Sequence, residues 1–326
     1  MKVLITGGAG YIGSHVVNLL GQAGHEIIIL DNLSTGRKAS VLYGNLVVGD
    51  LADTNFVSNL LKNEKFDICI HFAGSIIVPE SVTNPVKYYE NNTVNSLSLI
   101  KLCVQHNVKR FIFSSTAAVY GLAEGGKCVE TTLVNPINPY GRSKLMTEWT
   151  LQDAAVAHGL NFIALRYFNV AGANVENKIG QCSPFSTHLI KIACEVATGK
   201  RPKMQIFGTD YQTSDGTCIR DYIHVDDLAM AHVDALNYLA KEKSSHILNC
   251  GYGRGATVKQ VIETMRKISG KPILAEETGR RDGDSPELIA VADKIKTVLG
   301  WKPKYNDLEL ITKTALDWEI KFQSLK

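Results

Sequence analysis

Short runs of large apolar residues alternate with longer stretches of helical periodicity over the first half of this 326-residue chain. Each run is almost continuously apolar, which is typical of strands buried on both faces of a parallel sheet. This alternation predicts an α/β fold with a doubly wound parallel sheet and right-handed crossovers. The predicted strands are 2–6, 26–30, 46–50, 67–72, 110–115 and 161–169, and the predicted helices between them are 12–23, 54–63, 85–106 and 140–158.

The alternation of apolar runs and helical stretches becomes less regular after about residue 170, where the polar, glycine-containing segment 171–184 predicts a loop. A helix near 186–198, a strand at 203–208, a loop at 209–221, a helix at 225–241 and the strand "HILNCG" at 246–251 follow. Thr257, with Gln260 three residues later, indicates a capping box at the start of another helix. We interpret 1–170 as one domain and 171–326 as a smaller α/β substrate-binding lobe, with an approximate boundary because the lobes can interleave.

Composition and charge exclude several classes of protein. The net charge is only +3 and the basic residues are scattered, so we expect no nucleic-acid partner. Apolar runs such as "EIIIL" fall far short of the roughly 20 residues of a membrane span, and glycines interrupt the N-terminus before a signal peptide could form. Seven cysteines without a C-x-x-C pair indicate reduced thiols and a cytoplasmic protein. No metal is expected, because the nine histidines show no ligand spacing.

Gly7, Gly10 and Gly13 directly follow the first predicted strand and open a helix. Glycines there permit a tight turn and let the backbone approach a pyrophosphate at the helix N-terminus, as in a Rossmann-type fold. A purely structural turn is the alternative, but the strand before, the helix after and the acid at the end of strand two favour dinucleotide binding. That acid, Asp31, can accept from a ribose 2′-OH, which favours NAD over NADP; Arg37, with Lys38, works slightly against this preference.

Two further segments end predicted strands. Asp50 ends the third strand and "HFAG", residues 71–74, ends the fourth. Because ligands of open parallel sheets lie off the carboxyl ends of the strands, both segments are placed to line the adenosine and nicotinamide halves of the cofactor. A helix-capping or turn role is the alternative for Asp50.

The segment "NPYGRSK" contains a Y-x-x-x-K pair, Tyr140 and Lys144. Asn138 can cap the helix and Pro139 suits its first position, so the pair lies on one helix face. A tyrosine, with an ordinary pKa near 10, is a poor base alone; a neighbouring ammonium and an oxidised nicotinamide stabilise its phenolate. Thr116, in a hydroxyl-rich strand end, could share the substrate proton. An exposed amphipathic face is the alternative for the Tyr/Lys pair.

Seven motifs together carry a resemblance that covers essentially the whole chain: the glycine triplet, "LDN", "HFAG", "FSSTAAVYG", "NPYGRSK", "RYFNVAGA" and "IRDYIHVDDLA". In this order they resemble the extended short-chain dehydrogenase/reductase family and, within it, the UDP-sugar 4-epimerases. The resemblance implies a permanently bound NAD, a homodimer, and catalysis by Tyr140, Lys144 and Thr116. It implies cofactor contacts from Gly7, Gly10, Tyr11, Ile12, Gly13, Asp31, Asn32, Asp50, Leu51, Phe72, Ala73, Lys144 and Tyr167. It implies substrate contacts from Thr116, Tyr140, Asn169, His188, Leu189, Phe207, Arg220, Tyr222, Arg281 and Asp284.

A UDP-sugar carries a diphosphate, for which guanidinium groups are suited by their bidentate, charge-assisted contacts. Arg220 can supply one such group, although a structural bridge to Asp221 or Asp226 is the alternative. The resemblance favours Arg281 over its neighbour Arg280. Phe207 is a candidate to stack on the uracil, with core packing as the alternative, and Asp284 is a candidate acceptor for ribose hydroxyls, with capping as the alternative.

The implied reaction is a reversible oxidation at sugar C4 that interconverts UDP-galactose and UDP-glucose. Three positions bear on how closely the chain follows its relatives. Ile76 stands where many relatives have a lysine near the cofactor, and His188 stands where they often have an asparagine near the diphosphate. Leu288 resembles the gate of the sugar pocket, and its bulk favours glucose and galactose over N-acetyl sugars.

Several other activities are compatible with the same first oxidation. Nucleotide-sugar 4,6-dehydratases have an Asp-Glu pair after the strand-five hydroxyl and decarboxylases keep the Glu, whereas this chain has Ala117 and Ala118, which transfer no proton. An epimerase acting on UDP-N-acetylhexosamines or UDP-glucuronate is the nearer alternative. A non-catalytic NAD-binding sensor is the alternative from another class.

Overall fold

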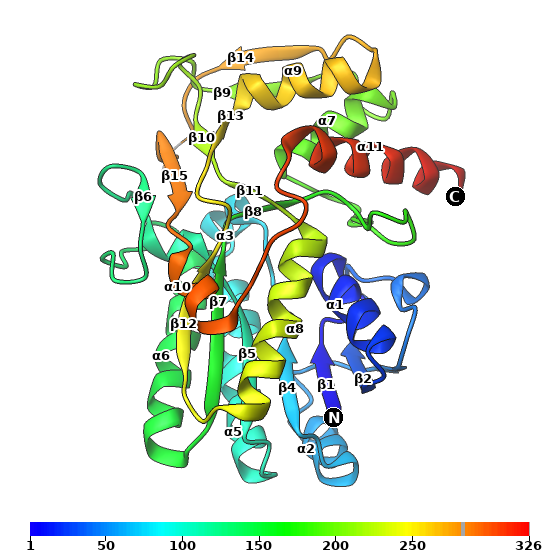
Figure 1. Cartoon of the computed structure of the whole chain (residues 1–326), viewed down its shortest axis with the longest axis vertical. Coiled ribbons are helices and arrows are strands. Elements are labelled where there is room, and N and C mark those ends of the chain that lie inside the picture. Colours follow the sequence, from blue (N-terminus) through cyan, green and yellow to red (C-terminus); the bar gives the residue numbers. More distant parts are fainter. Residues whose placement is uncertain (282–283, 326) are drawn as a thin grey trace.

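A seven-stranded parallel sheet forms the centre of the computed structural model, which describes residues 1–281 and 284–325 (Figure 1). The strand order is β12-β7-β5-β4-β1-β2-β3, and every neighbouring pair runs parallel. The predicted doubly wound fold is therefore confirmed. The strands are β1 (Lys2–Thr6), β2 (Glu26–Asp31), β3 (Asn45–Val48), β4 (Ile68–His71), β5 (Arg110–Thr116), β7 (Asn161–Tyr167) and β12 (His246–Cys250).

Both faces of this sheet are covered by helices, which explains why its strands are apolar without alternation. Val3 and Ile5 of β1 belong to a core cluster with residues of α1 (Tyr11–Gln22) and α8 (Val225–Lys241). Leu4, which points to the opposite face, belongs to a second cluster with residues of α2 (Thr54–Glu64), α5 (Asn95–Gln105) and α6 (Pro139–His158). Successive side chains of one strand thus enter different cores.

The seventh strand of the large sheet comes from the second half of the chain. The segment "HILNCG" forms β12, which pairs with β7 of the large sheet in the register Leu248–Leu165, so at this strand the two parts of the chain interleave. Helix α8 likewise belongs to the large domain, where it packs on α1. An apolar run predicts a buried strand but does not reveal which sheet edge receives it, and only the tertiary pairing decides this. The division near residue 170 is consequently not a clean cut.

The smaller lobe is built around α7 (Leu189–Ala197), α9 (Val258–Ser269) and α11 (Leu308–Ser324), which lie together at one end of the molecule (Figure 1). Strands β9 (Met204–Phe207) and β14 (Ala275–Thr278) pair beside them. The predicted capping box of Thr257 and Gln260 is confirmed at the start of α9. The remaining pairings of this region involve β6 (Lys127–Cys128), β8 (Asn169–Ala171), β10 (Ile219–Arg220), β11 (Tyr222–His224), β13 (Ala256–Thr257) and β15 (Glu287–Ala290), with α10 (Asp293–Leu299) following β15.

The helix predicted at 85–106 is interrupted. It consists of α4 (Pro85–Tyr88), a π-helical segment (Tyr89–Val94) and α5, after a separate short helix α3 (Val78–Thr83). π-Helical segments are rare and occur frequently at functional sites. This one places Asn92, which is buried, against the loop that follows β4.

In residues 1–281 and 284–325, no helix combines the length and the apolar character that a bilayer crossing requires. The same part of the chain holds no cluster of three or more side chains of the types that bind metals. All seven cysteines are free thiols, and six of them are buried.

Candidate active site

The glycine loop lies between β1 and α1 in a conformation that leaves no room for a side chain at Gly7 or Gly13. Gly7 has a left-handed φ of 72°, and a Cβ on it would lie 2.6 Å from the backbone nitrogen of Ala73. A Cβ on Gly13 would lie 2.4 Å from the carbonyl oxygen of Gly7. Gly10 donates its N–H to the same carbonyl at 3.1 Å. The loop therefore forms a cradle at the N-terminus of α1 that a phosphate group can approach closely.

Asp31 ends β2 beside this cradle. Its carboxylate is buried and accepts from the backbone N–H groups of Ala9, at 2.9 Å, and Leu33, at 2.8 Å. The bond to Ala9 ties the glycine loop to the end of the second strand. The predicted ribose acceptor thus stands where the first two strands end, with its orientation fixed by the backbone.

Asp50 and Asn32 lie together at the neighbouring strand ends. The Asn32 amide donates to the Asp50 carboxylate at 2.8 Å, and the backbone N–H of Ala52 donates to its other oxygen at 2.9 Å. The bond from Ala52, followed by that from Asn32, lowers the pKa of Asp50. Asp50 is therefore a turn residue that also keeps an exposed anionic carboxylate, so its two interpretations are compatible.

The segment after β4 runs directly over the end of β1. The backbone N–H groups of Phe72 and Ala73 both donate to the carbonyl of Thr6, at 2.9 and 3.2 Å. On the other side of β5, the buried Tyr167 shares a short hydrogen bond with the Ser114 hydroxyl. These predicted cofactor residues therefore border the carboxyl ends of the strands at the middle of the sheet.

The remaining predicted cofactor residues are mainly packed. Tyr11 begins α1, and its hydroxyl donates to the carbonyl of Gly172 at 2.6 Å, which joins the cradle to the loop after β8. Ile12 packs against one core of the large sheet and Leu51 against the other.

Helix α6 carries the Tyr140–Lys144 pair. The predicted cap is confirmed, since the Asn138 side chain accepts from the backbone N–H of Gly141 at 2.8 Å. The Lys144 ammonium is buried, donates to the carbonyl of Ser114 at 3.0 Å and lies 5.0 Å from the centroid of the Phe113 ring. The pair is therefore not an exposed helix face but is directed at the end of β5.

Thr116 is the last residue of β5, and its hydroxyl accepts from the backbone N–H of Ala118 at 3.1 Å. Burial raises the pKa of Tyr140, whereas hydrogen bonding from Thr116 lowers that pKa. Burial also lowers the pKa of Lys144 to about 8. The sequence predicts that Lys144 lowers the pKa of the phenol; in the structure this pKa is lowered by Thr116, whereas Lys144 faces Ser114.

One turn further along α6, Glu148 forms a buried ion pair with Arg166 of β7. The guanidinium of Arg166 contacts both carboxylate oxygens, with distances of 2.6, 2.9 and 3.2 Å. The hydroxyl of Ser115 donates to the same carboxylate. Tyr140, Lys144 and Glu148 are spaced four residues apart, so this ion pair anchors to β5 and β7 the helix face that carries the first two.

A cleft of about 830 Å³ opens at the smaller lobe, and among the described residues all of its lining except Pro79 comes from the second half of the chain. All of the predicted substrate residues outside the Thr116–Tyr140 pair line it: Asn169, His188, Leu189, Phe207, Arg220, Tyr222, Arg281 and Asp284. Thr116 and Tyr140 do not line the cleft. Pro79 of α3 does, and α3 packs on α6, the helix that carries Tyr140. Asn169 and Tyr222 lie opposite each other in neighbouring strands β8 and β11.

Asp284 lies between two arginines at the cleft. The guanidinium groups of Arg220 and Arg281 each approach its carboxylate to 3.5 Å, and that of Arg281 also lies 4.2 Å from the centroid of the Phe207 ring. Arg220 donates further to the carbonyls of Ile219, at 2.9 Å, and of Ser285, at 2.7 Å. Its alternative partners Asp221 and Asp226 are engaged elsewhere, by backbone N–H groups.

Arg280, the neighbour of Arg281, faces away from this cluster. It pairs with Asp210 at 2.8 Å and lies 4.3 Å from the centroid of the Tyr211 ring. Leu288 is partly buried against the core of the large domain and pairs with Arg220 across β15 and β10. Ile76 is exposed.

Sequence reasoning missed three residues at the site. Asn92 bridges the loop after β4 to α6, accepting from the N–H of Ser75 at 2.7 Å and donating to the Ser143 hydroxyl at 3.1 Å. Gln181 and Lys191 line the cleft. No sequence signal identifies them: Asn92 lies in an apparently regular helix, Gln181 in a polar loop, and Lys191 reads as a solvated helix residue although it is buried.

Comparison with known proteins identifies the class. A family model described as the NAD dependent epimerase/dehydratase family matches residues 3–251. The chain therefore belongs to this family. A curated relative, the UDP-glucose 4-epimerase of Azospirillum brasilense, is 51% identical over 319 residues, covering 98% of this chain and 92% of the relative.

Solved structures agree in fold over almost the whole chain. The UDP-glucose 4-epimerase of Brucella ovis in complex with NAD superposes with a TM-score of 0.94 at 41% identity, covering 97% of both chains. The UDP-Glc/GlcNAc 4-epimerase of Campylobacter jejuni superposes with a TM-score of 0.87 at 51% identity, covering 98% of this chain and 99% of that one.

Proposed function

We propose that this protein is a UDP-glucose 4-epimerase, an NAD-dependent enzyme that interconverts UDP-galactose and UDP-glucose. The observation that carries the proposal is the Tyr140–Lys144 pair on one face of α6, directed at the hydroxyl-bearing end of β5. The relative from Azospirillum brasilense, similar over 98% of this chain, bears the same activity in its name.

The residues at the ends of β1 and β2 fit an NAD molecule. A Cβ at Gly7 would collide with the backbone of Ala73 and one at Gly13 with the carbonyl of Gly7, so both glycines are required for the tight turn that presents the N-terminus of α1 to the diphosphate. The fixed carboxylate of Asp31 is an acceptor for ribose hydroxyls and repels a 2′-phosphate, so NAD is preferred over NADP. When bound, NAD supplies the acceptor that takes the hydrogen of sugar C4 as hydride and returns it.

The proton of the sugar 4-OH is handled by Tyr140 and Thr116. Tyr140 accepts this proton as a general base, and Thr116 hydrogen-bonds to Tyr140 and lowers the cost of the phenolate. Lys144 adds a positive charge below the site, because with a pKa of about 8 it is largely protonated at neutral pH. The same tyrosine returns the proton after the sugar has turned.

The cleft residues hold the nucleotide end of the substrate. We assign Arg220 and Arg281 to the diphosphate, Phe207 to the uracil ring and Asp284 to a ribose hydroxyl. The carboxylate of Asp284 lies 3.5 Å from both guanidinium groups, so it shares these two cations with the diphosphate. Contacts concentrated on UDP leave the sugar free to turn, which return of hydride to the other face requires.

The outcome of the reaction is restricted to epimerisation by the two residues after Thr116. Ala117 is buried and Ala118 follows it, and neither side chain can transfer a proton. Elimination of water from the oxidised sugar needs an additional acid and base. We therefore assign hydride return as the step that follows oxidation.

Activity tests the proposal directly. The purified protein, without added NAD, is incubated separately with UDP-galactose, UDP-N-acetylgalactosamine and UDP-glucuronate, and products are separated and weighed by mass spectrometry. We expect UDP-glucose from the first, of unchanged mass, and no conversion of the other two. Conversion of an N-acetyl sugar would replace the narrow specificity by a broader one, as in the name of the Campylobacter jejuni neighbour. Bound NAD without any turnover would instead identify a sensor.

We further propose a cytoplasmic homodimer. Helices α5 and α6 pack side by side, and large apolar side chains on their outer surface and the π-helical segment are exposed: Val94, Leu97, Met146, Trp149 and Val156. Association would bury this patch. Light scattering should give twice the chain mass for the wild type and the mass of one chain for the variant Trp149→Glu. The free cysteines support a reducing compartment.

A further inference from the structure

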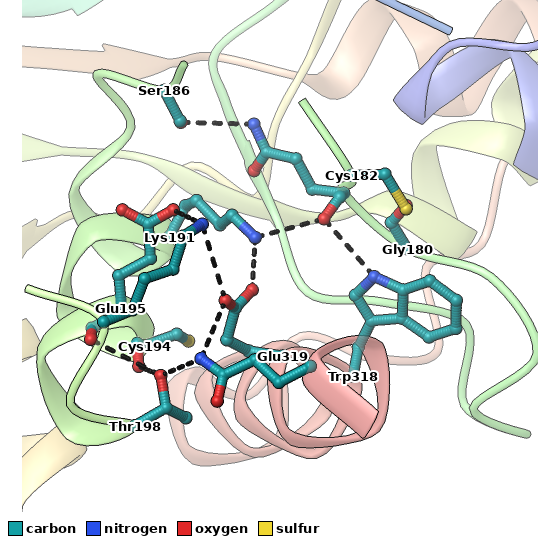
Figure 2. A network of polar contacts seen from close by, with 12 residues as sticks. Gly180, Cys182, Ser186, Lys191, Cys194, Glu195, Thr198, Trp318 and Glu319 are labelled. Atoms are coloured by element: carbon teal, nitrogen blue, oxygen red, sulfur yellow. Dashed lines mark hydrogen bonds and ion pairs between the residues drawn. The ribbon is translucent and has the colours of Figure 1, made fainter. Parts of the chain in front are cut away.

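The loop that leads into α7 is held by a buried polar network (Figure 2). Lys191 and Glu319 form a buried ion pair between α7 and α11, and the Lys191 ammonium also donates to the carbonyl of Gln181 at 3.2 Å. The indole N–H of Trp318 donates to the same carbonyl at 3.3 Å. The backbone of Gln181 is thus fixed from two sides at the wall of the cleft.

The side chain of Gln181 is directed at His188. Its amide nitrogen donates to Nδ1 of His188 at 3.2 Å and to the Ser186 hydroxyl at 3.2 Å. An imidazole nitrogen that accepts a hydrogen bond carries no proton, so the ring proton of a neutral His188 must lie on Nε2. Nε2 makes no hydrogen bond to the described part of the chain, and His188 is exposed within the cleft lining.

We propose that Gln181 is a positioning residue that fixes His188 in the tautomer whose Nε2–H donates to a diphosphate oxygen of the UDP-sugar. The inference rests on the proposed function, because it assumes that UDP occupies the cleft. It explains how a histidine can bind at a position where members of the family that the chain resembles often have an asparagine. A histidine in the other tautomer would present a lone pair to the phosphate and repel it.

The surroundings favour a neutral His188. The ring stands at the N-terminus of the nine-residue helix α7, whose dipole disfavours an added positive charge there. The charged groups that line the same cleft are Lys191 of α7, paired with Glu319 of α11, Arg201 and Lys203 before β9, Arg220 of β10, and Arg281 with Asp284. Arg201 and Lys203 are paired with Glu195 and Glu276, so Arg220 and Arg281, which share the single carboxylate of Asp284, supply positive charge for the diphosphate without a further charge on the ring.

A double-mutant cycle tests the inference. The dissociation constant of UDP is measured by calorimetry on the cofactor-loaded protein as purified, for the wild type, Gln181→Leu, His188→Ala and the double variant. We expect each single change to raise the constant about tenfold, as for a lost hydrogen bond to a charged group. If Gln181 acts through His188, the double variant loses about tenfold as well, not about a hundredfold.

Two controls separate positioning from loss of structure. The Gln181 carbonyl, which carries the structural contacts, is present in every variant, so the thermal midpoint should stay close to that of the wild type. Ser186→Ala removes the second acceptor of the Gln181 amide and the acceptor of the His188 backbone N–H, but leaves the bond from Gln181 to Nδ1, and should change UDP affinity by at most about threefold. Independent, multiplying effects of Gln181→Leu and His188→Ala, or an unchanged affinity of Gln181→Leu, would overturn the inference. Failure of the wild type to bind UDP at all would instead overturn the proposed function.

The variant Gln181→Glu provides a test based on the pH dependence of KM, which a merely structural role of Gln181 would leave unchanged. A carboxylate can only accept from Nδ1–H, which shifts the proton of a neutral ring to Nδ1 and turns Nε2 into an acceptor. The KM for UDP-galactose should therefore rise at alkaline pH and recover at acidic pH, where the ring gains a second proton. The wild type should lack this dependence, with kcat little affected in both proteins. A flat KM for Gln181→Glu would contradict the assigned tautomer.

Discussion

Lys144 donates from its buried ammonium group to the backbone carbonyl of Ser114, 3.0 Å away. The contact joins the catalytic helix to the strand that ends in Thr116, two residues further on. Burial lowers the pKa of Lys144 to about 8, from an ordinary value of 10.5. The ammonium is thus maintained at a cost to the folded state.

This cost predicts a pH-dependent stability. A lysine whose pKa is lower in the folded state binds fewer protons there than in the unfolded chain between pH 8 and 10.5, so stability rises with pH across that window. The rise attributable to Lys144 is at most about 3 kcal/mol. Lys144→Met should remove it, as measured by denaturant unfolding at pH 7.5 and 10. Lys101→Met, at an exposed position, is the matched control and should leave the rise intact. Equal rises in the wild type and Lys144→Met would contradict the assignment.

Tyr140→Phe removes the group that takes the 4-OH proton but keeps the ring. We expect kcat for UDP-galactose to fall by about 10²–10⁴, as for the loss of a general base, with UDP affinity unchanged. Near-normal interconversion would exclude Tyr140 as the base.

Thr116 tunes the same phenol. Because hydrogen bonding from Thr116 lowers the pKa of Tyr140, Thr116→Val should move the rising limb of the kcat/KM profile to higher pH. Thr116→Ser keeps the hydroxyl and should keep the wild-type profile. A limb that does not move in Thr116→Val would show that the hydroxyl acts on something other than the phenol.

Gly13 and Gly10 form a matched pair in the cradle. A Cβ at Gly13 would lie 2.4 Å from the Gly7 carbonyl, whereas one at Gly10 would lie 3.2 Å from the same atom. Gly13→Ala should therefore displace the loop and reduce the NAD that co-purifies with the protein, measured by absorbance after acid release. Gly10→Ala should retain more of it. Equal retention by both variants would argue against a steric cradle.

Removing one partner of the Glu148–Arg166 ion pair should lower the free energy of unfolding more than replacing both partners. Glu148→Gln leaves a buried guanidinium uncompensated and is expected to cost about 3–5 kcal/mol of unfolding free energy. Replacing both residues, Glu148→Leu with Arg166→Met, should cost less than the single change, as measured by chemical denaturation. The exposed pair Lys313–Asp317 is the control, where Asp317→Asn should have no measurable effect. A double variant with a lower free energy of unfolding than Glu148→Gln would mean that the pair is needed for more than charge balance.

The sequence predicts the large sheet well because the apolar pattern of each strand reflects the burial of its two faces. Residues 2–6 are apolar throughout since Leu4 enters one core and Val3 and Ile5 the other. Local rules also suffice for the cap at Asn138 and the capping box at Thr257, which depend on neighbours within three residues. Tertiary pairing is different in kind, and the sheet edge that receives β12 could not be read from its residues.

The site shows the same division. Strand-end positions such as Asp31 and Thr116 are predictable, because the carboxyl ends of parallel strands meet at one edge. The direction of the Lys144 ammonium toward Ser114 was not predictable from the sequence, since it depends on how α6 packs on β5. Gln181 was not identified because its carbonyl is held by a residue far away in the chain, Trp318, which lies 137 positions further on.

The late arrival of β12 has a consequence for how the chain is made. A fragment that stops near residue 170 would present β7 as an unpaired edge, with a row of free N–H and C=O groups open to another chain. During synthesis, the same edge of β7 stays unpaired until β12, which ends at Cys250, has been added. The two halves of this enzyme are therefore not separable modules, and expression of either one alone should yield aggregates.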